Sequence, residues 1–520
     1  MADLPERIGV VGAGTMGAGI AQLGVLAGIE TLIHDPYPDA LERAGEYVHS
    51  GLAKGAKRGR WSADEASAAE ERLRRVPELS DLADCGLVIE AAPEKPELKR
   101  ELFEELSEVC GPDTVLATNT SSILVTSLAS AADRPENVVG MHFFNPPPLM
   151  RLLELIAAEQ TGERALEVAR AVGEAMGKHV IVASDGPGFL VNRCGRPFGG
   201  EALRLLQERV ATHEQIDRIA RLGGGFRMGP FELMDLVGID VGYEVARSFD
   251  SQSFGEPRWK PSMLQARKVA AGQLGRKTGR GWYDYSGETH RPEDPPAREA
   301  GGGDGRRVAI EGSGALAREL VERARAAGFD ARAPDEFHGP EGPELIVDAA
   351  VPSMWTDIGD ADTGPPLVVA VADESLSERD LPAAGFHALP PLAESKLVEL
   401  TRTPLTPEAT AAAAEDFFTA LGFHVEWVGD APGLVLGRIV CGLVNEAAFA
   451  VGEGVGSAED VDAGLELGLN HPRGPLAWGR AIGWDHVLSV IDGLYMERYG
   501  DRYRSAPGLR RAAGLGWDIG

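Results

Sequence analysis

The sequence predicts an α/β domain with a doubly wound parallel sheet, then an all-α domain, then a diverged, truncated second copy of both. Three observations support this prediction. Apolar runs alternate with amphipathic stretches in the first third of the chain, the pattern becomes helical from Gly188 onwards, and motifs of the first half recur in the second. A chain of 520 residues is also long enough for about three or four domains.

The elements of the first two domains follow in order. The expected strands are IGVV (8–11), ETLIHD (30–35), GLVIEA (86–91), TVLATN (114–119) and VVGMHFF (138–144). Short apolar runs of this kind are typical of buried parallel strands. The expected helical stretches are residues 189–208, 214–224 and 231–249. We therefore place the α/β domain at residues 1–185 and the helical domain at 186–285.

The second half repeats the first at a fixed spacing. LLELI (152–156) and LVELT (397–401) lie 245 positions apart, as do DGPGFLVNR (185–193) and DAPGLVLGR (430–438). The glycine turns GAGTMG and GSGALA lie 300 positions apart, so the second α/β domain must be 55 residues shorter. Residues 286–305 are rich in Pro, Gly and charge, which predicts a flexible linker. The truncated copy then spans 306–395 and the second helical domain 396–520.

The composition excludes several classes of partner and site. With 51 Lys and Arg against 80 Asp and Glu, the net charge of −29 argues against nucleic acid and anionic membranes. The four cysteines lack the paired spacing of metal ligands, so we expect free thiols, no metal and no disulfide. No secretion signal is recognisable at the start, and no apolar run reaches the roughly 18 residues of a membrane span. We expect a cytoplasmic protein.

The motif GAGTMG follows the first expected strand and opens a helix. In this spacing Gly12 permits a tight turn, Gly14 lets a pyrophosphate approach the backbone, and Gly17 allows close helix packing. Asp35 ends the next strand, 21 positions after Gly14, where a carboxylate can bind ribose hydroxyls and repel a 2′-phosphate. This arrangement predicts a Rossmann-type NAD site. The alternative is an ordinary strand–helix turn, with Asp35 as a turn residue.

A candidate acid/base pair lies further along the α/β domain. His142 is near the end of an apolar strand, and Glu154 is embedded in the apolar LLELI. A buried carboxylate is costly without a partner, and the intervening NPPP turn could bring the two side chains together. A histidine held by a carboxylate can remove a proton from an alcohol. The alternative for a lone histidine here is a packing role in the core.

Five motifs together resemble the L-3-hydroxyacyl-CoA dehydrogenase family: GAGTMGAGIAQ, NTSS (119–122), HFFNPPPLMRLLELI, DGPGFLVNR and GRKTGRGWYDY. The resemblance covers residues 6–285, and more weakly about 306–505, as in long bacterial members with a duplicated C-terminal unit. It implies reversible, NAD-dependent oxidation of an L-3-hydroxyacyl-CoA in fatty-acid metabolism or β-oxidation. Expected substrates are short, such as 3-hydroxybutyryl-CoA, or dicarboxylic, such as 3-hydroxyadipyl-CoA.

The resemblance also implies residue roles. His142 would be the catalytic base, Glu154 its orienting partner, and Ser121 and Asn192 would hydrogen-bond the substrate. NAD would be bound by Gly12, Ala13, Gly14, Thr15, Met16, Gly17, Asp35, Glu94, Lys99, Ser121, Asn145 and Lys277. Coenzyme A would be bound by Lys54, Lys57, Arg58 and the nearby Arg60. From the residues alone, Ser121 could be a helix N-cap, Asn192 a polar helix position, and the charged residues solvated surface groups.

The second copy keeps little of this set. His387 and Glu399 occupy the positions of the acid/base pair, but Gly437 replaces Asn192 and Pro366 replaces Ser121. We therefore expect a structural remnant. Because the family dimerises through its helical domains, the chain is expected to form a homodimer or an intramolecular pseudo-dimer.

Two other functions remain open from the sequence. One is a related hydroxy-acid dehydrogenase of the L-gulonate type. The other is a non-catalytic protein that binds NAD or acyl-CoA.

Overall fold

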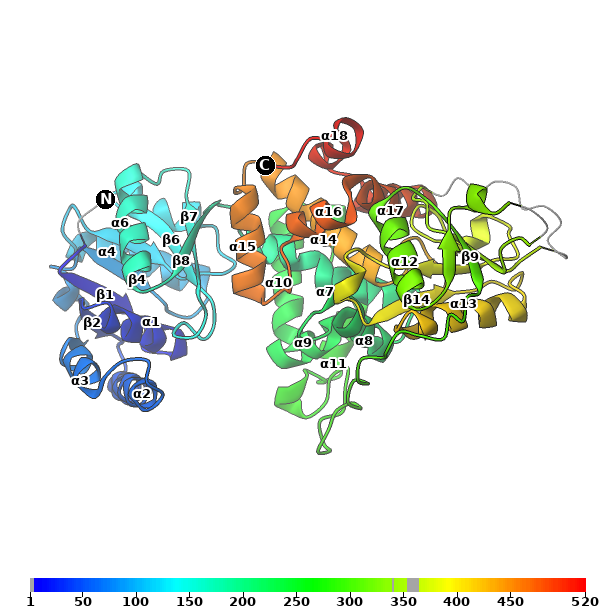
Figure 1. The fold of residues 1–520 in the computed structure, drawn as a ribbon. Coiled ribbons are helices and arrows are strands. Elements are labelled where there is room, and N and C mark those ends of the chain that lie inside the picture. The colour runs from blue at the N-terminus through cyan, green and yellow to red at the C-terminus, as the bar shows by residue number, and fades with distance from the viewer. Residues whose placement is uncertain (1–3, 339–340, 353–363) are drawn as a thin grey trace. The chain divides into compact units, whose positions relative to one another are not determined.

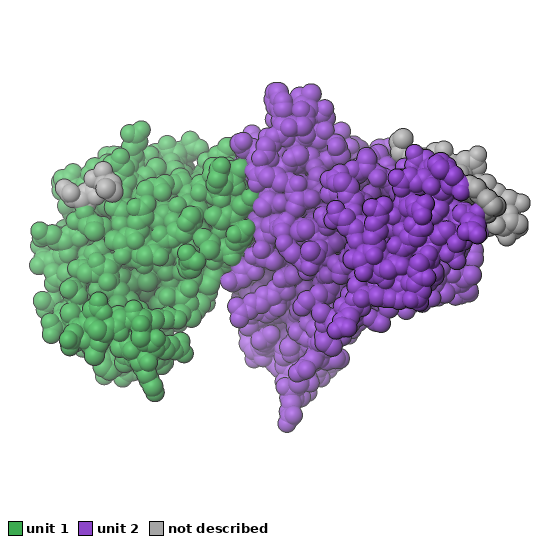
Figure 2. All heavy atoms as spheres, viewed as in Figure 1, with its two compact units in different colours: residues 1–193, 454–469 green, residues 194–453, 470–520 purple. Residues whose placement is uncertain are grey.

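The computed structural model describes residues 4–338, 341–352 and 364–520, which divide into two compact units (Figure 2). The first unit comprises Met1–Arg193 and Gly454–Leu469, and the second comprises Cys194–Glu453 and Asn470–Gly520. Within the described residues, no helix is both long and apolar enough to cross a membrane.

The first unit is built on an eight-stranded sheet in the order β3-β2-β1-β4-β5-β6-β7-β8 (Figure 1). Its strands are β1 (Arg7–Val11), β2 (Glu30–His34), β3 (Leu73–Val76), β4 (Leu87–Glu90), β5 (Val115–Thr118), β6 (Val138–Phe143), β7 (Leu152–Ala157) and β8 (His179–Ser184). All neighbouring pairs are parallel except β6 and β7. The five expected strands are confirmed as β1, β2, β4, β5 and β6.

Helices of the first unit pack apolar residues on this sheet. They are α1 (Thr15–Leu26), α2 (Pro38–Lys57), α3 (Ala63–Glu71), α4 (Pro96–Val109), α5 (Val125–Ala129), α6 (Glu163–Ala175), the start of α7 (Val191–Gln207), and α15 (Ala458–Leu469). The main core joins β1 to apolar residues of α1, α2 and α6. The doubly wound α/β domain predicted from the sequence is therefore confirmed.

The second unit contains the helical domain, followed by a second sheet and further helices. The helices are α7 from Cys194 onwards, α8 (His213–Gly224), α9 (Pro230–Val237), α10 (Ile239–Gln252), α11 (Met263–Ala270), α12 (Ala315–Ala326), α13 (Glu408–Ala420), α14 (Leu436–Gly452), α16 (Pro475–Ile482), α17 (Trp484–Arg498) and α18 (Pro507–Leu515). The expected helical stretch 231–249 is divided into α9 and α10 at Gly238, whose φ is +107°.

The second sheet is a shortened copy of the first. Its strands are β9 (Arg307–Glu311), β10 (Asp330–Arg332), β11 (Leu345–Asp348), β12 (Leu367–Ala370), β13 (Ala384–His387), β14 (Leu397–Thr401) and β15 (His424–Trp427), in the order β10-β9-β11-β12-β13-β14-β15. Only β13 and β14 are antiparallel, as β6 and β7 are in the first sheet. The described residues between β10 and β11 contain no counterpart of α2, α3 or β3.

Residues 286–305, expected to be a linker, contain no helix or strand but are tied to the second unit by polar contacts. Asp294 pairs with Arg221 at 2.8 Å. Arg291 pairs with Glu232 at 2.7 Å, and the N–H of Gly301 donates to the carbonyl of Ala420 at 2.8 Å. The segment therefore has fixed partners along its length.

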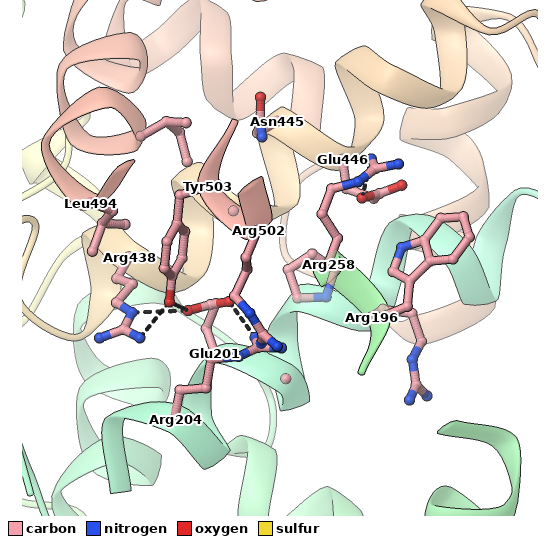
Figure 3. A pocket seen from close by; sticks show the side chains of 15 residues that line it. Arg196, Glu201, Arg204, Arg258, Arg438, Asn445, Glu446, Leu494, Arg502 and Tyr503 are labelled. Carbon is pink, nitrogen blue, oxygen red and sulfur yellow. Dashed lines mark hydrogen bonds and ion pairs between the residues drawn. The ribbon is translucent and has the colours of Figure 1, made fainter. Parts of the chain in front are cut away.

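A buried ion network joins the two helical copies inside the second unit (Figure 3). Arg438 of α14 is fully buried and lies 2.9 Å from Glu201 and 2.6 Å from Glu208, both on α7. It also donates to the hydroxyl of Tyr503 at 2.6 Å. Glu201, Arg438 and Tyr503 border a small pocket of about 40 Å³. Arg438, Glu201 and Glu208 therefore each have an ion-pair partner in the other copy.

Candidate active site

The glycine turn of the first unit has one open side. Gly12 has a φ of +103°, and a Cβ there would lie 2.7 Å from the carbonyl oxygen of Ala91. A Cβ on Gly17 would lie 1.8 Å from the carbonyl oxygen of Gly12, whereas one on Gly14 would meet nothing within 4 Å. No side chain caps the N-terminus of α1, so its first N–H groups face this open side. The turn therefore has room, and donors, for a pyrophosphate.

Asp35 lies beside this turn at the end of β2. Its Oδ2 accepts the N–H of Ala13 at 2.9 Å, and its Oδ1 accepts the N–H of Tyr37 at 3.0 Å. The carboxylate thus fixes the loop and, being only partly buried, keeps lone pairs for further donors. Ribose hydroxyls are donors of the appropriate kind.

A second polar cluster lies after β4 and β5. Lys99 is buried and donates to both oxygens of Glu90, at 2.7 and 2.8 Å, and lies 3.3 Å from Glu94. Glu94 Oε1 accepts the hydroxyl of Thr120 at 2.5 Å and the N–H of Ser121 at 3.0 Å. Although burial opposes it, the Lys99 ammonium, with these donors, lowers the pKa of Glu94. Lys99 therefore holds the NTSS loop in place through Glu94.

His142 and Glu154 face each other across the antiparallel strands β6 and β7. His142 Nδ1 lies 2.9 Å from Glu154 Oε2, and Glu154 is completely buried. Its other oxygen accepts the N–H groups of Leu190 and Val191, at 2.8 and 3.1 Å. A carboxylate can only accept, so Nδ1 must be the donor, which leaves the lone pair of Nε2 free to take a proton.

Other expected site residues of the first unit lie on loops at the edge of the sheet where β6 ends. The loops after β1, β4, β5 and β6 meet at one sheet edge because these adjacent strands are parallel. They carry the glycine turn, Glu94 and Ser121, together with Asn145 just beyond β6. Asn192 lies in the first turn of α7, directly after the N–H groups that hold Glu154, and is partly exposed.

Lys277 is not brought into this cluster within the first unit. It belongs to the second unit, where its Nζ lies 2.6 Å from Asp240 Oδ1.

Sequence reasoning did not single out two supporting residues of the first unit. Asn119 Oδ1 accepts the N–H of Phe143 at 2.8 Å, which joins the NTSS loop to the strand of His142. Glu90 is fully buried and binds Lys99. The position of Glu90 near the end of the apolar run GLVIEA could have indicated a buried carboxylate that needs a partner.

A larger pocket of about 660 Å³ lies between α2, the NPPP turn and the end of α6. Its basic lining residues are Lys54, Arg58, Arg60, Arg151 and Lys178. Lys57 is exposed and is not part of this lining. Burial lowers the pKa of Lys178 to about 8, while its ammonium donates to the carbonyls of Pro147 and Met150. The pocket concentrates positive charge in an acidic chain.

Comparison with known proteins identifies the family to which this chain belongs. Residues 7–186 match the NAD binding domain of 3-hydroxyacyl-CoA dehydrogenase, and residues 188–285 and 433–516 match its C-terminal domain. The 3-hydroxyadipyl-CoA dehydrogenase of Escherichia coli is 34% identical over 98% of this chain and 97% of its own length. The chain belongs to the 3-hydroxyacyl-CoA dehydrogenase family. It is an NAD-dependent oxidoreductase, as the sequence predicted.

Two further relatives of this dehydrogenase show how the match is distributed. A 3-hydroxybutyryl-CoA dehydrogenase of Bradyrhizobium diazoefficiens is 40% identical over 55% of this chain and 98% of its own length. A crystal structure titled 3-hydroxybutyryl-CoA dehydrogenase, from Escherichia coli, aligns over 99% of both chains with a TM-score of 0.84 and 33% identity. The dehydrogenase therefore has relatives of one copy and of two copies.

In the second copy of this dehydrogenase, His387 and Glu399 do not form the pair that His142 and Glu154 form. His387 and Glu399 are register partners in β13 and β14, but His387 Nε2 lies 3.1 Å from Nε2 of His486. Glu399 keeps only the backbone contacts, with the N–H groups of Val435 and Leu436 at 2.7 and 3.0 Å. The second copy, expected to be a structural remnant, therefore lacks the histidine–glutamate hydrogen bond of the first copy, because the imidazole contacts a different partner.

Proposed function

We propose that the working site of this dehydrogenase is the one in the first unit, with His142 as the base. As the C3–H bond breaks and its hydride leaves, the substrate hydroxyl transfers its proton to His142 Nε2 and the carbonyl forms. NAD supplies the hydride acceptor when bound at the glycine turn. The observation that carries this proposal is the 2.9 Å contact that directs His142 Nε2 away from Glu154.

Glu154 keeps the imidazole in one orientation and stabilises its charged form after proton transfer. It can do so because the N–H groups of Leu190 and Val191 hold its other oxygen. Ser121 and Asn192 would hydrogen-bond the substrate oxygen and carbonyl. Asp35 and residues 12–17 would hold NAD, with Glu94 and Asn145, while Lys99 acts through Glu94.

The basic pocket is proposed to bind the phosphates of coenzyme A. Lys54, Arg58 and Arg60 are exposed on or near α2, so they are free to meet an anion. Arg151 adds a charge that the sequence interpretation did not include. Guanidinium groups suit phosphate because they can donate two parallel hydrogen bonds.

The proposed substrate is a short-chain or dicarboxylic 3-hydroxyacyl-CoA. Support comes from the two-copy relative named 3-hydroxyadipyl-CoA dehydrogenase and the one-copy relatives named 3-hydroxybutyryl-CoA dehydrogenase. The test is the rate of NADH oxidation with acetoacetyl-CoA, with 3-oxoadipyl-CoA and with free acetoacetate, repeated with NADPH. We expect turnover of a thioester with NADH. Turnover of the free acid alone would contradict the CoA assignment.

We also propose that one chain forms its own pseudo-dimer. A cytoplasmic setting is proposed as well, and it suits the four buried cysteines. The buried contacts of Arg438 with Glu201 and Glu208 join α14 to α7 as a subunit interface would. Sedimentation of the full chain should give a monomer. Removing residues 296–520 should cause aggregation or homodimerisation, and a fully active monomeric truncation would contradict the proposal.

A further inference from the structure

Helix α15 belongs to the second copy in sequence but packs in the first unit, against β7 and β8 (Figure 1, orange). The strand β8 ends at Ser184, whose N–H donates to the carbonyl of Val455 at 2.8 Å. The hydroxyl of Ser184 donates to the carbonyl of Gly454 at 3.0 Å. The segment before α15 is therefore fixed to β8, the strand that precedes the Leu190–Val191 turn.

Two glycines, one helical turn apart, let α15 approach this region closely. A Cβ on Gly464 would lie 2.9 Å from Val191, and one on Gly468 would lie 2.8 Å from Leu152 and 3.2 Å from Val191. A Cβ on Gly468 would also lie 3.3 Å from the ring of Phe144. No side chain larger than hydrogen fits at these positions without movement of its neighbours.

The residues that α15 touches are those that hold the acid/base pair. Val191 donates its N–H to Glu154, and the ring of Phe144 packs against that of His142 with centroids 4.6 Å apart. Gly456, just before α15, adds a contact with Leu190, the other donor to Glu154. The second copy thus contacts residues that hold both members of the pair.

The second unit shows the same arrangement with the copies exchanged. The N–H of Gly429 donates to the carbonyl of Val210 at 2.6 Å, and each residue lies 245 positions from its counterpart in the Ser184–Val455 bond. Helix α8 of the first copy packs on β14 of the second sheet. There Gly223 takes the place of Gly468, and its Cβ would lie 3.2 Å from Leu436.

We propose that α15 is a positioning element of the working active site, supplied by the catalytically degenerate copy. It fixes the Leu190–Val191 turn and Phe144, and so keeps His142 and Glu154 in the geometry for proton transfer. This inference rests on the roles proposed above for His142 and Glu154. It gives the second copy a function in catalysis, although that copy lacks counterparts of Ser121 and Asn192 and does not form a histidine–glutamate pair.

The test compares Gly468→Val with Gly223→Val in the full chain, since both place the same side chain against equivalent residues of the two sheets. Gly468→Val should lower kcat roughly 10- to 100-fold, because small misplacements of a catalytic group are costly. KM for NADH should stay within about twofold, since the glycine turn is untouched. The solvent deuterium isotope effect on kcat should rise as proton transfer becomes slower. Gly223→Val should keep the kcat and isotope effect of the wild type.

The milder Gly468→Ala, and Gly468→Val combined with Leu152→Ala, keep the test decisive if Gly468→Val fails to fold. The double variant removes the Leu152 side chain that the new Cβ would meet, and it should recover part of kcat. Equal losses in Gly468→Val and Gly223→Val would overturn the inference, because the effect would then be general destabilisation. Wild-type kcat in folded Gly468→Val and Gly468→Ala would also overturn the inference. An active His142→Ala enzyme would instead refute the proposed function.

Discussion

His387 and His486 share one proton between two buried imidazoles, with their Nε2 atoms 3.1 Å apart. Two ring nitrogens can form this bond only when one donates and the other accepts. The ring of His387 occupies the space beside Gly437, where a Cβ would lie 2.2 Å from Cε1. Gly437, at the position equivalent to Asn192, has no side chain and so leaves room for the His387 ring in this orientation.

The buried pair of His387 and His486 should make the stability of the folded protein depend on pH. Burial lowers the pKa of His486 to about 4 and that of His387 well below its usual range. The unfolded chain then binds more protons than the folded one between about pH 6.5 and 4, so stability falls as the pH falls. His486→Gln should reduce this loss by up to roughly 3 kcal/mol, measured as unfolding temperature against pH.

His49→Gln, at an exposed histidine, is the control for this measurement and should leave the pH dependence unchanged. Burial raises the pKa of Glu399 to about 8, which acts in the opposite direction. The difference between wild type and variant therefore isolates the histidine. Identical slopes in wild type and His486→Gln would refute the assignment.

The two histidines at equivalent positions should differ in catalysis. His142→Ala should lower kcat roughly 10²- to 10⁴-fold, because the general base is lost. His387→Ala should keep wild-type kcat, since His387 binds His486 and not Glu399. NADH absorbance with acetoacetyl-CoA measures both rates. Loss of turnover in His387→Ala with activity retained in His142→Ala would reverse the site assignment.

Asp35 should determine the choice of cofactor. Asp35→Ser replaces the carboxylate that accepts the Ala13 N–H, and would accept ribose hydroxyls, with a shorter neutral hydroxyl, and it removes the charge that repels a 2′-phosphate. KM for NADH should rise about 10- to 100-fold, and the preference over NADPH should shrink. Asp39→Ser, at an exposed position in the first turn of α2, should change neither value. An unchanged cofactor preference in Asp35→Ser would contradict the prediction.

Arg438 should be critical for stability. Arg438→Met leaves buried Glu201 without its Arg438 partner, which should cost about 3 to 5 kcal/mol, read from the denaturation midpoint. Arg510→Met breaks an exposed pair with Asp492 and should cost less than about 1 kcal/mol. Similar midpoints for the two variants would show that the buried network contributes little.

Local sequence patterns were sufficient to predict much of the structure of the first unit. The apolar runs predicted β1, β2, β4, β5 and β6. The prediction that the NPPP turn brings Glu154 beside His142 is also confirmed. The strand β3 was not predicted, because its residues Arg74 and Arg75 are exposed and leave no apolar signal. Its place is decided by pairing with β2, which is distant in sequence.

Features that depend on distant packing were beyond the sequence. The constant spacing placed His387 and Glu399 at the positions of His142 and Glu154 in an expected remnant. It could not indicate that His387 contacts His486, with its ring beside Gly437. The same holds for α15. Its sequence predicts a helix of the second copy, but nothing local indicates that it packs on β7 and β8.

The exchanged helices bear on how such a chain can change after duplication. Because each sheet is packed against a helix encoded in the other copy, deletion of either copy would remove a support from the sheet that remains. With the positioning role proposed for α15, a second copy without chemistry of its own would still be constrained as a scaffold. Gly464 and Gly468 would then be constrained by the first copy's active site.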